Sequence, residues 1–465
     1  MINITQTTQA NHYDREPPAK KQVPTLMEKR SFFLLHDTEE FMRGELDNVT
    51  VAESHILLDV VQGGYVPYGC YTSAPIPMPA FDALRPSWNA YTPPGTAVEV
   101  QARVMVDGNW TAWSGFGRWS PFLRREGART LTRGPLTLTP DLLTLDSKVA
   151  NQVQLRIYLY TKDEKATPQV ALLGAGVRVV DVIPGGGRPV NARLRLPAYA
   201  VARRAPALRP QMDLACSIAS LTNRWGADIL PEELALAMRD WLGGPNLCFG
   251  AAAAGCWGFP AWVCWADLGL LRAELRAGFG VVVELESSPA RQQAGWPERR
   301  YAALRGFAVV DGQPHALLND PCAAETDFDT EVSMPLDDFL VSWTNVALCL
   351  RPRKAVPMQG RPWRSGVWVR PAGKDLPGIY RMTLAGEEKR LPDDFCGSFD
   401  APTGVLAWTA PEERPHATTA HKLFHFVEPV SGGVQLAPGD EGRHIKYTVY
   451  AIDASGCMLV GDVTV

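Results

Sequence analysis

No hydrophobic run in the 465-residue sequence approaches the ~18 residues that a membrane-spanning helix needs. The layout of a signal peptide is also absent, because residues 1–22 are polar and show no basic segment followed by an apolar one. The nine cysteines are odd in number and include no CxxC pair, which argues against a zinc knuckle and against a disulfide framework. These absences predict a cytoplasmic protein without a membrane span.

Neither sign of charge is in excess, since 46 basic residues stand against 50 acidic ones. A nucleic acid or an anionic membrane surface is therefore not predicted as a partner. The 46% of hydrophobic residues is typical of a globular protein, and the length predicts about three domains. Patterns along the chain predict a flexible tail at residues 1–30, a β domain at 31–184, a linker at 185–209, a mixed domain at 210–352 and a second β domain at 361–465.

Alternating apolar and polar residues predict strands in the first β domain. The alternation covers residues 98–106 and again 153–159, as in strands with one buried face. Asp107-Gly108 follows the first run directly and is a strong hairpin signal. Regular turn signals without a long helical pattern predict a β-sandwich or jelly roll.

Residues 210–226 contain the strongest candidate for catalysis. Their i, i+3, i+4, i+7 spacing predicts a helix whose buried stripe consists of Ile218, Leu221, Thr222 and Trp225. Cys216 then lies at or beside the start of the helix, where unpaired backbone N–H groups and the helix dipole favour the thiolate. Gln211 can donate a side-chain N–H to a developing oxyanion. The alternative is that Cys216 is an ordinary small core residue.

This stretch resembles the nucleophile segment of papain-like cysteine peptidases of the double-glycine, bacteriocin-processing type. Residues 246–255 and the helical pattern that ends at Gly278 match further segments of that family in the same order. Residues 87–120, with their tryptophans, resemble the β domain that precedes the peptidase-like domain in bacterial relatives.

The predicted fold class is therefore α+β and multidomain. The resemblance implies an N-terminal β-sandwich or jelly roll followed by a central papain-like α+β domain. Strand and turn patterns from residue 361 onward add a small C-terminal β-sandwich, which the resemblance does not cover.

Of the family's histidine and the aspartate that orients it, this sequence keeps only the aspartate. Residues 316–321 end in Asn-Asp-Pro and match the strand that carries the aspartate, which is Asp320 here. Arg305-Gly306-Phe307 matches the end of the strand that begins with the histidine, and counting back places Arg300 at the histidine's position.

The hairpin that joins these two strands gives an independent register. A turn at Asp311-Gly312 pairs Val310 with Gln313 and brings Asp320 opposite the region of Ala303. His315 does not replace the missing histidine, because five residues of strand separate it from Asp320 by about 16 Å.

Without an adjacent imidazole, Cys216 lacks the group that removes its proton and protonates a leaving amine. Arg300 can pair with Asp320, but a guanidinium does not shuttle protons at neutral pH. We therefore expect a cysteine peptidase homologue whose hydrolysis of peptide or amide bonds is weak or lost. If the site acts, Cys216 is the nucleophile, Gln211 the oxyanion donor and Asp320 the orienting carboxylate.

Two other functions stay open. One is a non-catalytic binding or scaffold protein whose cleft and β domains hold a peptide, glycan or protein partner. The other is acyl transfer by the Cys216 thiolate, which needs a general acid less than hydrolysis does. None of these functions is expected to need a cofactor.

Two groups of side chains are weaker candidates. The tryptophans between Trp88 and Trp119 include candidates for a glycan contact, but indoles are more often core residues. His416, His421 and His425 lie close together in sequence and contain metal-ligating groups. Because the residues around His425 alternate as in a strand, solvated histidines are favoured and no metal site is predicted.

Overall fold

The computed structural model describes residues 31–352 except 94, 122, 124, 182–191, 205–211, 226, 228, 230 and 324. Beyond residue 352 it describes the backbone of eight strands, β24 to β31. The predicted tail at residues 1–30, residues 185–191 and 205–209 of the predicted linker at 185–209, and Gln211, His416 and His421 lie outside the described residues.

The N-terminal part is a β structure whose strands are joined by hydrogen bonds into one 14-stranded sheet. Its longest strands, β8, β15 and β16, each pair with several others and change register at irregularities. The strands are β1 (Phe32–Leu35), β2 (Glu45–Asp47), β3 (Val49–Ala52), β4 (His55–Leu58), β7 (Tyr68–Thr72), β8 (Ile76–Tyr91), β9 (Thr96–Val106), β10 (Asn109–Trp110), β11 (Ser114–Trp119), β12 (Leu131–Arg133), β13 (Leu136–Leu138), β14 (Leu143–Leu145), β15 (Ala150–Thr161) and β16 (Gln169–Val179). Outside this sheet lie the short helix α1 (Thr38–Phe41) and the hairpin of β5 (Val60–Val61) and β6 (Gly64–Tyr65). The arrangement of the sheet as a sandwich or jelly roll stays a prediction.

The two alternating runs form strands as predicted. Val98, Val100, Ala102 and Val104 in β9 are buried, and so are the alternate residues of β15 that start at Val153. Asp107 and Gly108 have positive φ angles of 49° and 78°, and they connect β9 to β10 with Asn109 opposite Val106. A two-residue turn of this kind matches the twist of the strands that it joins, which is why the sequence signal was reliable.

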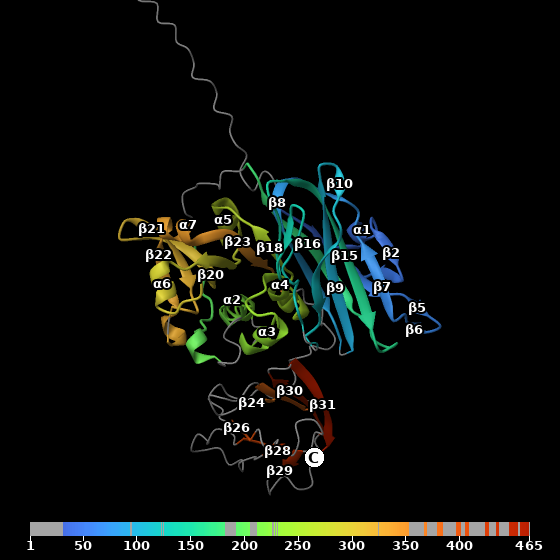
Figure 1. Cartoon of the computed structure of the whole chain (residues 1–465). Coiled ribbons are helices and arrows are strands. Elements are labelled where there is room, and N and C mark those ends of the chain that lie inside the picture. Colours follow the sequence, from blue (N-terminus) through green and yellow to red (C-terminus); the bar gives the residue numbers. More distant parts are fainter. Residues whose placement is uncertain are drawn as a thin grey trace, which may run out of the picture.

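The central part has a seven-stranded sheet with helices around it (Figure 1). The strand order is β18-β23-β19-β20-β21-β22, and β17 pairs with β20. The strands are β17 (Ala192–Arg193), β18 (Ala261–Trp265), β19 (Val281–Glu286), β20 (Arg299–Val310), β21 (Gln313–Asn319), β22 (Glu331–Pro335) and β23 (Trp343–Leu350). The helices are η1 (Val201–Arg203), α2 (Met212–Asn223), α3 (Pro231–Ala237), α4 (Leu247–Cys256), α5 (Leu268–Arg276), α6 (Pro289–Gln293), η3 (Asp327–Asp329) and α7 (Leu336–Ser342).

Local patterns predicted several of these elements correctly. Leu268, Leu271 and Leu275 form the buried side of α5, and β19 is buried along nearly its whole length. The predicted turn at Asp311-Gly312 joins β20 to β21 with Val310 opposite Gln313. Amphipathic helices and strongly apolar strands depend mainly on side-chain burial, which the sequence pattern records directly.

The helix around Cys216 differs from the prediction at both ends. Trp225, predicted on its buried stripe, lies after the last helical residue and is 41% exposed. At the other end the helix already includes Met212, so Cys216 is its fifth residue and not its first. Methionine, leucine and alanine are strong helix formers, and the run before Cys216 consists mostly of them.

One hydrophobic core cluster extends through the N-terminal and the central parts. Helix α4 packs against β8 and β18 against β16, so the two sheets lie directly beside each other (Figure 1). A Cβ atom at Gly176 in β16 would overlap the carbonyl oxygen of Val263 in β18, which shows how closely the two backbones approach. Residues 31–184 and 210–352 therefore share a core, although they were predicted as separate domains.

The C-terminal part contains two four-stranded sheets in its described backbone. One has the order β24-β25-β30-β31 and the other β26-β27-β28-β29. The strands are β24 (Val367–Val369), β25 (Ile379–Leu384), β26 (Gly397–Asp400), β27 (Val405–Trp408), β28 (Phe424–Phe426), β29 (Val434–Leu436), β30 (Lys446–Asp453) and β31 (Gly456–Thr464). The predicted strands of this region are present, and His425 lies in β28. Their packing as a sandwich stays a prediction.

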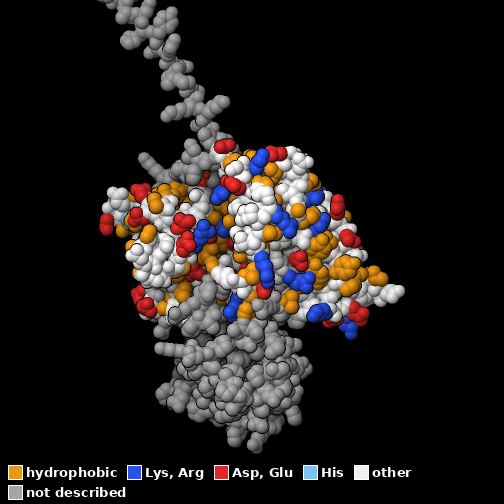
Figure 2. Space-filling model, in the orientation of Figure 1, with side chains coloured by type: hydrophobic (Ala, Val, Ile, Leu, Met, Phe, Trp, Pro, Cys, Tyr) orange, Lys and Arg blue, Asp and Glu red, His pale blue; other side chains and the backbone are white. Residues whose placement is uncertain are grey.

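Within the described residues, no helix is both long and apolar enough to cross a membrane. On the face of the molecule seen in Figure 2, basic and acidic side chains are interspersed over the described elements. This distribution fits the near balance of 46 basic and 50 acidic residues.

Candidate active site

Cys216 lies inside helix α2 with a side chain that is 0% exposed. The unpaired N–H groups of a helix are those of its first turn. Because four helical residues precede Cys216, the prediction that it sits at the helix start, among these groups, is wrong. The helix dipole therefore contributes less to a thiolate here than the sequence pattern predicted.

Arg300 and Asp320 form a buried ion pair at the ends of two neighbouring strands. The Nε atom of Arg300, near the start of β20, lies 2.9 Å from Oδ2 of Asp320, directly after β21. Both side chains are almost fully buried, at 0% and 2% exposure. The register Ala303 opposite Asn319 places Asp320 where the hairpin predicted it.

A bulge in β20 shifts this register by one residue. Leu304 pairs with Leu318 and Gly306 with Leu317, so Arg305 has no partner in β21. Its side chain instead forms an ion pair with Glu331 in β22. The irregularity, which the sequence did not predict, lies between the turn and the pair of Arg300 and Asp320.

The remaining contacts of Arg300 hold its guanidinium in place. Nη1 donates to the carbonyl oxygen of Glu286 and to Oγ of Ser287, both at 3.3 Å. The guanidinium carbon lies 5.2 Å from the centre of the Trp296 ring, a cation–π contact. Among the described residues Nη2 has no hydrogen-bond partner.

Asp213 is a third charged side chain of this site, which sequence reasoning missed. It lies on α2, three residues before Cys216, and its carboxylate accepts from the backbone N–H of Tyr301 at 3.0 Å and of Leu214 at 2.9 Å. Burial, with a smaller contribution from nearby Asp320, raises the pKa of Asp213 to about 7 against the opposing effect of the two N–H groups. A lone carboxylate in an otherwise apolar helical run was the available signal.

The backbone of Tyr301, in β20, is bound to α2 through both its N–H and its carbonyl group. Its N–H donates to Asp213, and its carbonyl oxygen accepts from Oγ of Ser217 at 3.1 Å. Asp213 and Ser217 are four residues apart, so they share one face of the helix. Cys216 lies between them in sequence, and the helix that carries it is thereby fixed against the strand of Arg300.

Cys322 completes the group near the ion pair. Its backbone N–H donates to Oδ1 of Asp320 at 3.1 Å. Burial raises the pKa of the Cys322 thiol, Asp213 and Asp320 raise it further, and Arg300 opposes them. Because a thiolate is the reactive form, this raised pKa disfavours Cys322 as a nucleophile.

His315 is a partly exposed residue of the hairpin of β20 and β21. Its Nδ1 lies 3.0 Å from the carbonyl oxygen of Gln313, and the residue pairs with Ala308 and Pro335. Its place near the turn, at the other end of β21, separates it from Asp320. The carboxylate of Asp320 thus contacts a guanidinium, which holds charge but transfers no proton at neutral pH.

The tryptophans of the N-terminal part contact protein groups. Trp88 and Trp119 are fully buried, as expected for core indoles. Trp113 is partly exposed, but its ring contacts the guanidinium groups of Arg103 at 4.6 Å and Arg156 at 4.0 Å. These contacts use the ring surface that a sugar needs, so they give no support to a glycan contact.

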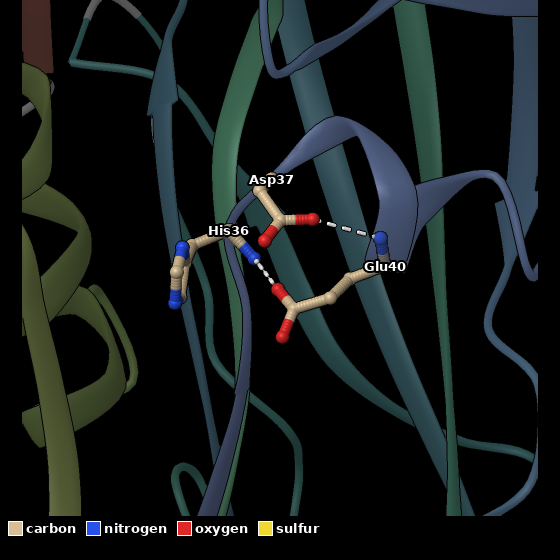
Figure 3. Close-up of side chains that lie close together, drawn as sticks. All are labelled: His36, Asp37 and Glu40. Atoms are coloured by element: carbon tan, nitrogen blue, oxygen red, sulfur yellow. Dashed lines mark hydrogen bonds between the residues drawn. The ribbon is translucent and has the colours of Figure 1, made fainter.

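His36, Asp37 and Glu40 are a group of potential metal ligands within the described residues (Figure 3). Asp37 accepts from the backbone N–H of Glu40, and Glu40 accepts from that of His36, each at 2.8 Å. This pattern is similar to the capping box of a helix start, except that Glu40 accepts from the residue before the N-cap Asp37. It accounts for both carboxylates without a metal ion.

Helix α2, which carries Cys216, is hydrogen-bonded to the strand of Arg300, whose partner Asp320 follows the neighbouring strand. Residues 35–177 match a family model described as Peptidase C39 N-terminal domain. This match confirms that the chain is similar to cysteine peptidase-like proteins of the C39, double-glycine type.

Solved structures with similarity to the chain include two peptidases from transporters. One is a double glycine motif protease from an AMS/PCAT transporter in complex with the leader peptide, with 20% identity over 36% of this chain and 99% of that one and a TM-score of 0.25. The other is the peptidase domain of Streptococcus ComA, a bi-functional ABC transporter involved in a quorum sensing pathway, with 17% identity over 31% of this chain and 93% of that one and a TM-score of 0.24. No curated protein matched the chain.

Proposed function

We propose that the chain is a papain-like, double-glycine-type cysteine peptidase homologue whose hydrolysis of peptide or amide bonds is weak or lost. Cys216 holds the position of the nucleophile, Asp320 that of the orienting carboxylate and Gln211 that of the oxyanion donor. Arg300 occupies the position of the general base. The observation that carries this proposal is the buried contact of 2.9 Å between Arg300 and Asp320.

The chemical reason is the difference between a guanidinium and an imidazole. An imidazole takes the proton of the thiol and returns it to the leaving amine, and general acid–base catalysis of this kind contributes about 10²–10⁴ in rate. Arg300 keeps a positive charge beside Asp320 and supplies neither step. The complete burial of the Cys216 side chain further limits attack on a substrate.

Replacing Arg300 with histidine tests this proposal. The wild-type protein is expected to cleave a peptide library, including peptides with Gly-Gly sites, weakly or not at all. Arg300→His places an imidazole within reach of Asp320 and should raise cleavage by at least about 10²-fold. The double variant with Cys216→Ala should lose that gain. Efficient cleavage by the wild type that Cys216→Ala abolishes contradicts a lost function.

A non-catalytic binding protein is the second candidate, and the burial of Cys216 favours it. In that case the cleft holds a peptide or a loop of a protein partner without cutting it. Wild type and Cys216→Ala should then bind the same library members with equal affinity, since the thiol takes no part. A binding difference of tenfold or more, about 1.4 kcal/mol, contradicts this alternative.

A further inference from the structure

The N-terminal part contacts the central part through polar groups as well as through the shared core. Asn89 in β8 donates to the carbonyl oxygens of Ala251 and Ala261 at 3.2 and 2.9 Å and accepts from the N–H of Ala261 at 2.9 Å. Ser87 accepts from the N–H of Val263. These buried bonds fix β8 directly on α4 and β18.

Arg85, on the same strand, is a buried cation between the two parts. Its residue is 3% exposed, and its guanidinium lies 5.4 Å from the centre of the Trp265 ring. Nε is 3.6 Å from Asp141, in the N-terminal part, and Nη2 is 3.8 Å from Glu284, in β19 of the central sheet. A buried charge is strongly unfavourable unless it is paired, so these three groups depend on one another.

Glu284 connects Arg85 to β20, the strand of the candidate site. One carboxylate oxygen accepts from the hydroxyl of Tyr301 at 3.0 Å, and the other accepts from Thr344 at 2.7 Å. Burial raises the pKa of the Tyr301 phenol, and Glu284 raises it further, so the phenol keeps the proton that it donates. Tyr301 is the residue next to Arg300.

The same tyrosine holds helix α2 through its backbone. Its N–H binds Asp213 and its carbonyl oxygen binds Ser217, the two residues that flank Cys216 on the helix. These contacts thus form a continuous path from Arg85 through Glu284 and Tyr301 to α2. Each link is a hydrogen bond or ion pair between buried groups, where such interactions are strongest.

From this chain of contacts we infer that Arg85 is a positioning residue for the Cys216 site: the N-terminal part sets the placement of α2 on β20 through Glu284 and Tyr301. The inference rests on the proposed function in taking Cys216 and Asp320 as the site. It assigns the N-terminal part a role in the site itself, in addition to packing.

The test measures alkylation of Cys216 by iodoacetamide, read by mass spectrometry of the peptide that contains it. Rates are recorded in native conditions from about pH 6 to about pH 10, where thiols titrate. Tyr301→Phe removes one hydroxyl and should raise the rate about fivefold, because the hydrogen bond that ties Glu284 to the strand holding α2 is lost. Arg85→Met should change the rate and its pH profile in the same direction, and Arg85→Lys should restore both.

The double variant of Arg85→Met and Tyr301→Phe tests whether the two residues act through one connected path of contacts or independently. If both substitutions interrupt the same path of contacts, Cys216 in the double variant is alkylated no faster than in the more reactive single variant. A rate increase equal to the product of the two single increases contradicts the inference. If Arg85→Met does not fold, Glu284→Gln takes its place, since it keeps the size of the side chain and removes the charge that Arg85 holds.

Arg351→Met is the matched control. Arg351 is paired with Glu274 and lies 4.8 Å from the Trp262 ring, so it resembles Arg85 in its contacts but is not part of the chain. It should lower global stability and leave Cys216 alkylation unchanged. An equal effect of Arg351→Met on alkylation overturns the inference. Because alkylation needs no turnover, absence of peptidase activity leaves this result unaffected.

Discussion

Replacing Asp213 with asparagine should remove a loss of stability that the wild type shows as the pH rises. In the folded chain, burial raises the pKa of this carboxyl from 3.8 to about 7. Between these two values the folded state binds more protons than the unfolded state, so the free energy of unfolding falls with rising pH and levels off above the window. A difference of about 3 pKa units corresponds to ~4 kcal/mol.

The asparagine variant has no charge to titrate at this position. Its amide oxygen can accept one of the two backbone N–H groups, but its NH₂ faces the other, so one hydrogen bond worth about 1 kcal/mol is lost. The variant should therefore be less stable than the wild type near pH 4 and more stable near pH 8, with the two curves crossing between about these values.

Urea unfolding at a series of pH values measures this difference, with the free energy extrapolated to zero denaturant. Subtracting the two curves removes the contribution of all groups that titrate alike in both proteins. Asp267→Asn is the control, because Asp267 is a buried helix-start carboxylate that accepts from Leu270 N–H at 2.8 Å and lies outside the site. Parallel curves for wild type and Asp213→Asn between pH 4 and pH 8, roughly the window of the shift, refute the reasoning.

Two further predictions concern strand β20, which contains Arg300 and Gly306. Arg300→Met should cost about 3–5 kcal/mol in the free energy of unfolding, because it leaves Asp320 buried without its cation, and the double variant with Asp320→Asn should recover much of the loss in urea unfolding. Gly306→Ala should destabilise the protein by ~1–3 kcal/mol, since its Cβ would overlap the carbonyl oxygen of Ala192, whereas Gly115→Ala has space and should have little effect on the melting temperature. Equal melting temperatures for the two glycine variants contradict this second prediction.

Short-range signals predicted the strand pair of the site well. The Asp311-Gly312 turn fixes the register of β20 and β21, and this register alone brings Asp320 close to the start of β20. The bulge at Arg305 was not predictable from local patterns, since β20 also pairs with β17 there and Arg305 forms an ion pair with Glu331 in β22. It moves the register by one residue, which the long side chain of Arg300 spans.

The features that the sequence did not predict depend on burial against distant parts of the chain. The start of α2 was misplaced because the apolar run before Cys216 has no helical periodicity when the helix is buried on all sides. The sequence likewise did not indicate that the N-terminal and central parts share a core. Asn89 and Ser87 are polar residues in a strand, and only the backbone groups of β18 and α4 opposite them give them their role.

The charges buried around the site explain why Asp213 is the carboxyl with the pKa near neutrality. Asp141 and Glu284 are both paired with Arg85, and Asp320 is paired with Arg300. None of the ion pairs in the described part of the chain includes Asp213, which is held by neutral backbone N–H groups instead. Burial is the main cause that raises the pKa of Asp213 to about 7, and the negative charge of nearby Asp320 adds to it. An imidazole at position 300 would alternate between neutral and charged forms in the same pH range and so couple to this proton, whereas the guanidinium keeps the number of cations constant.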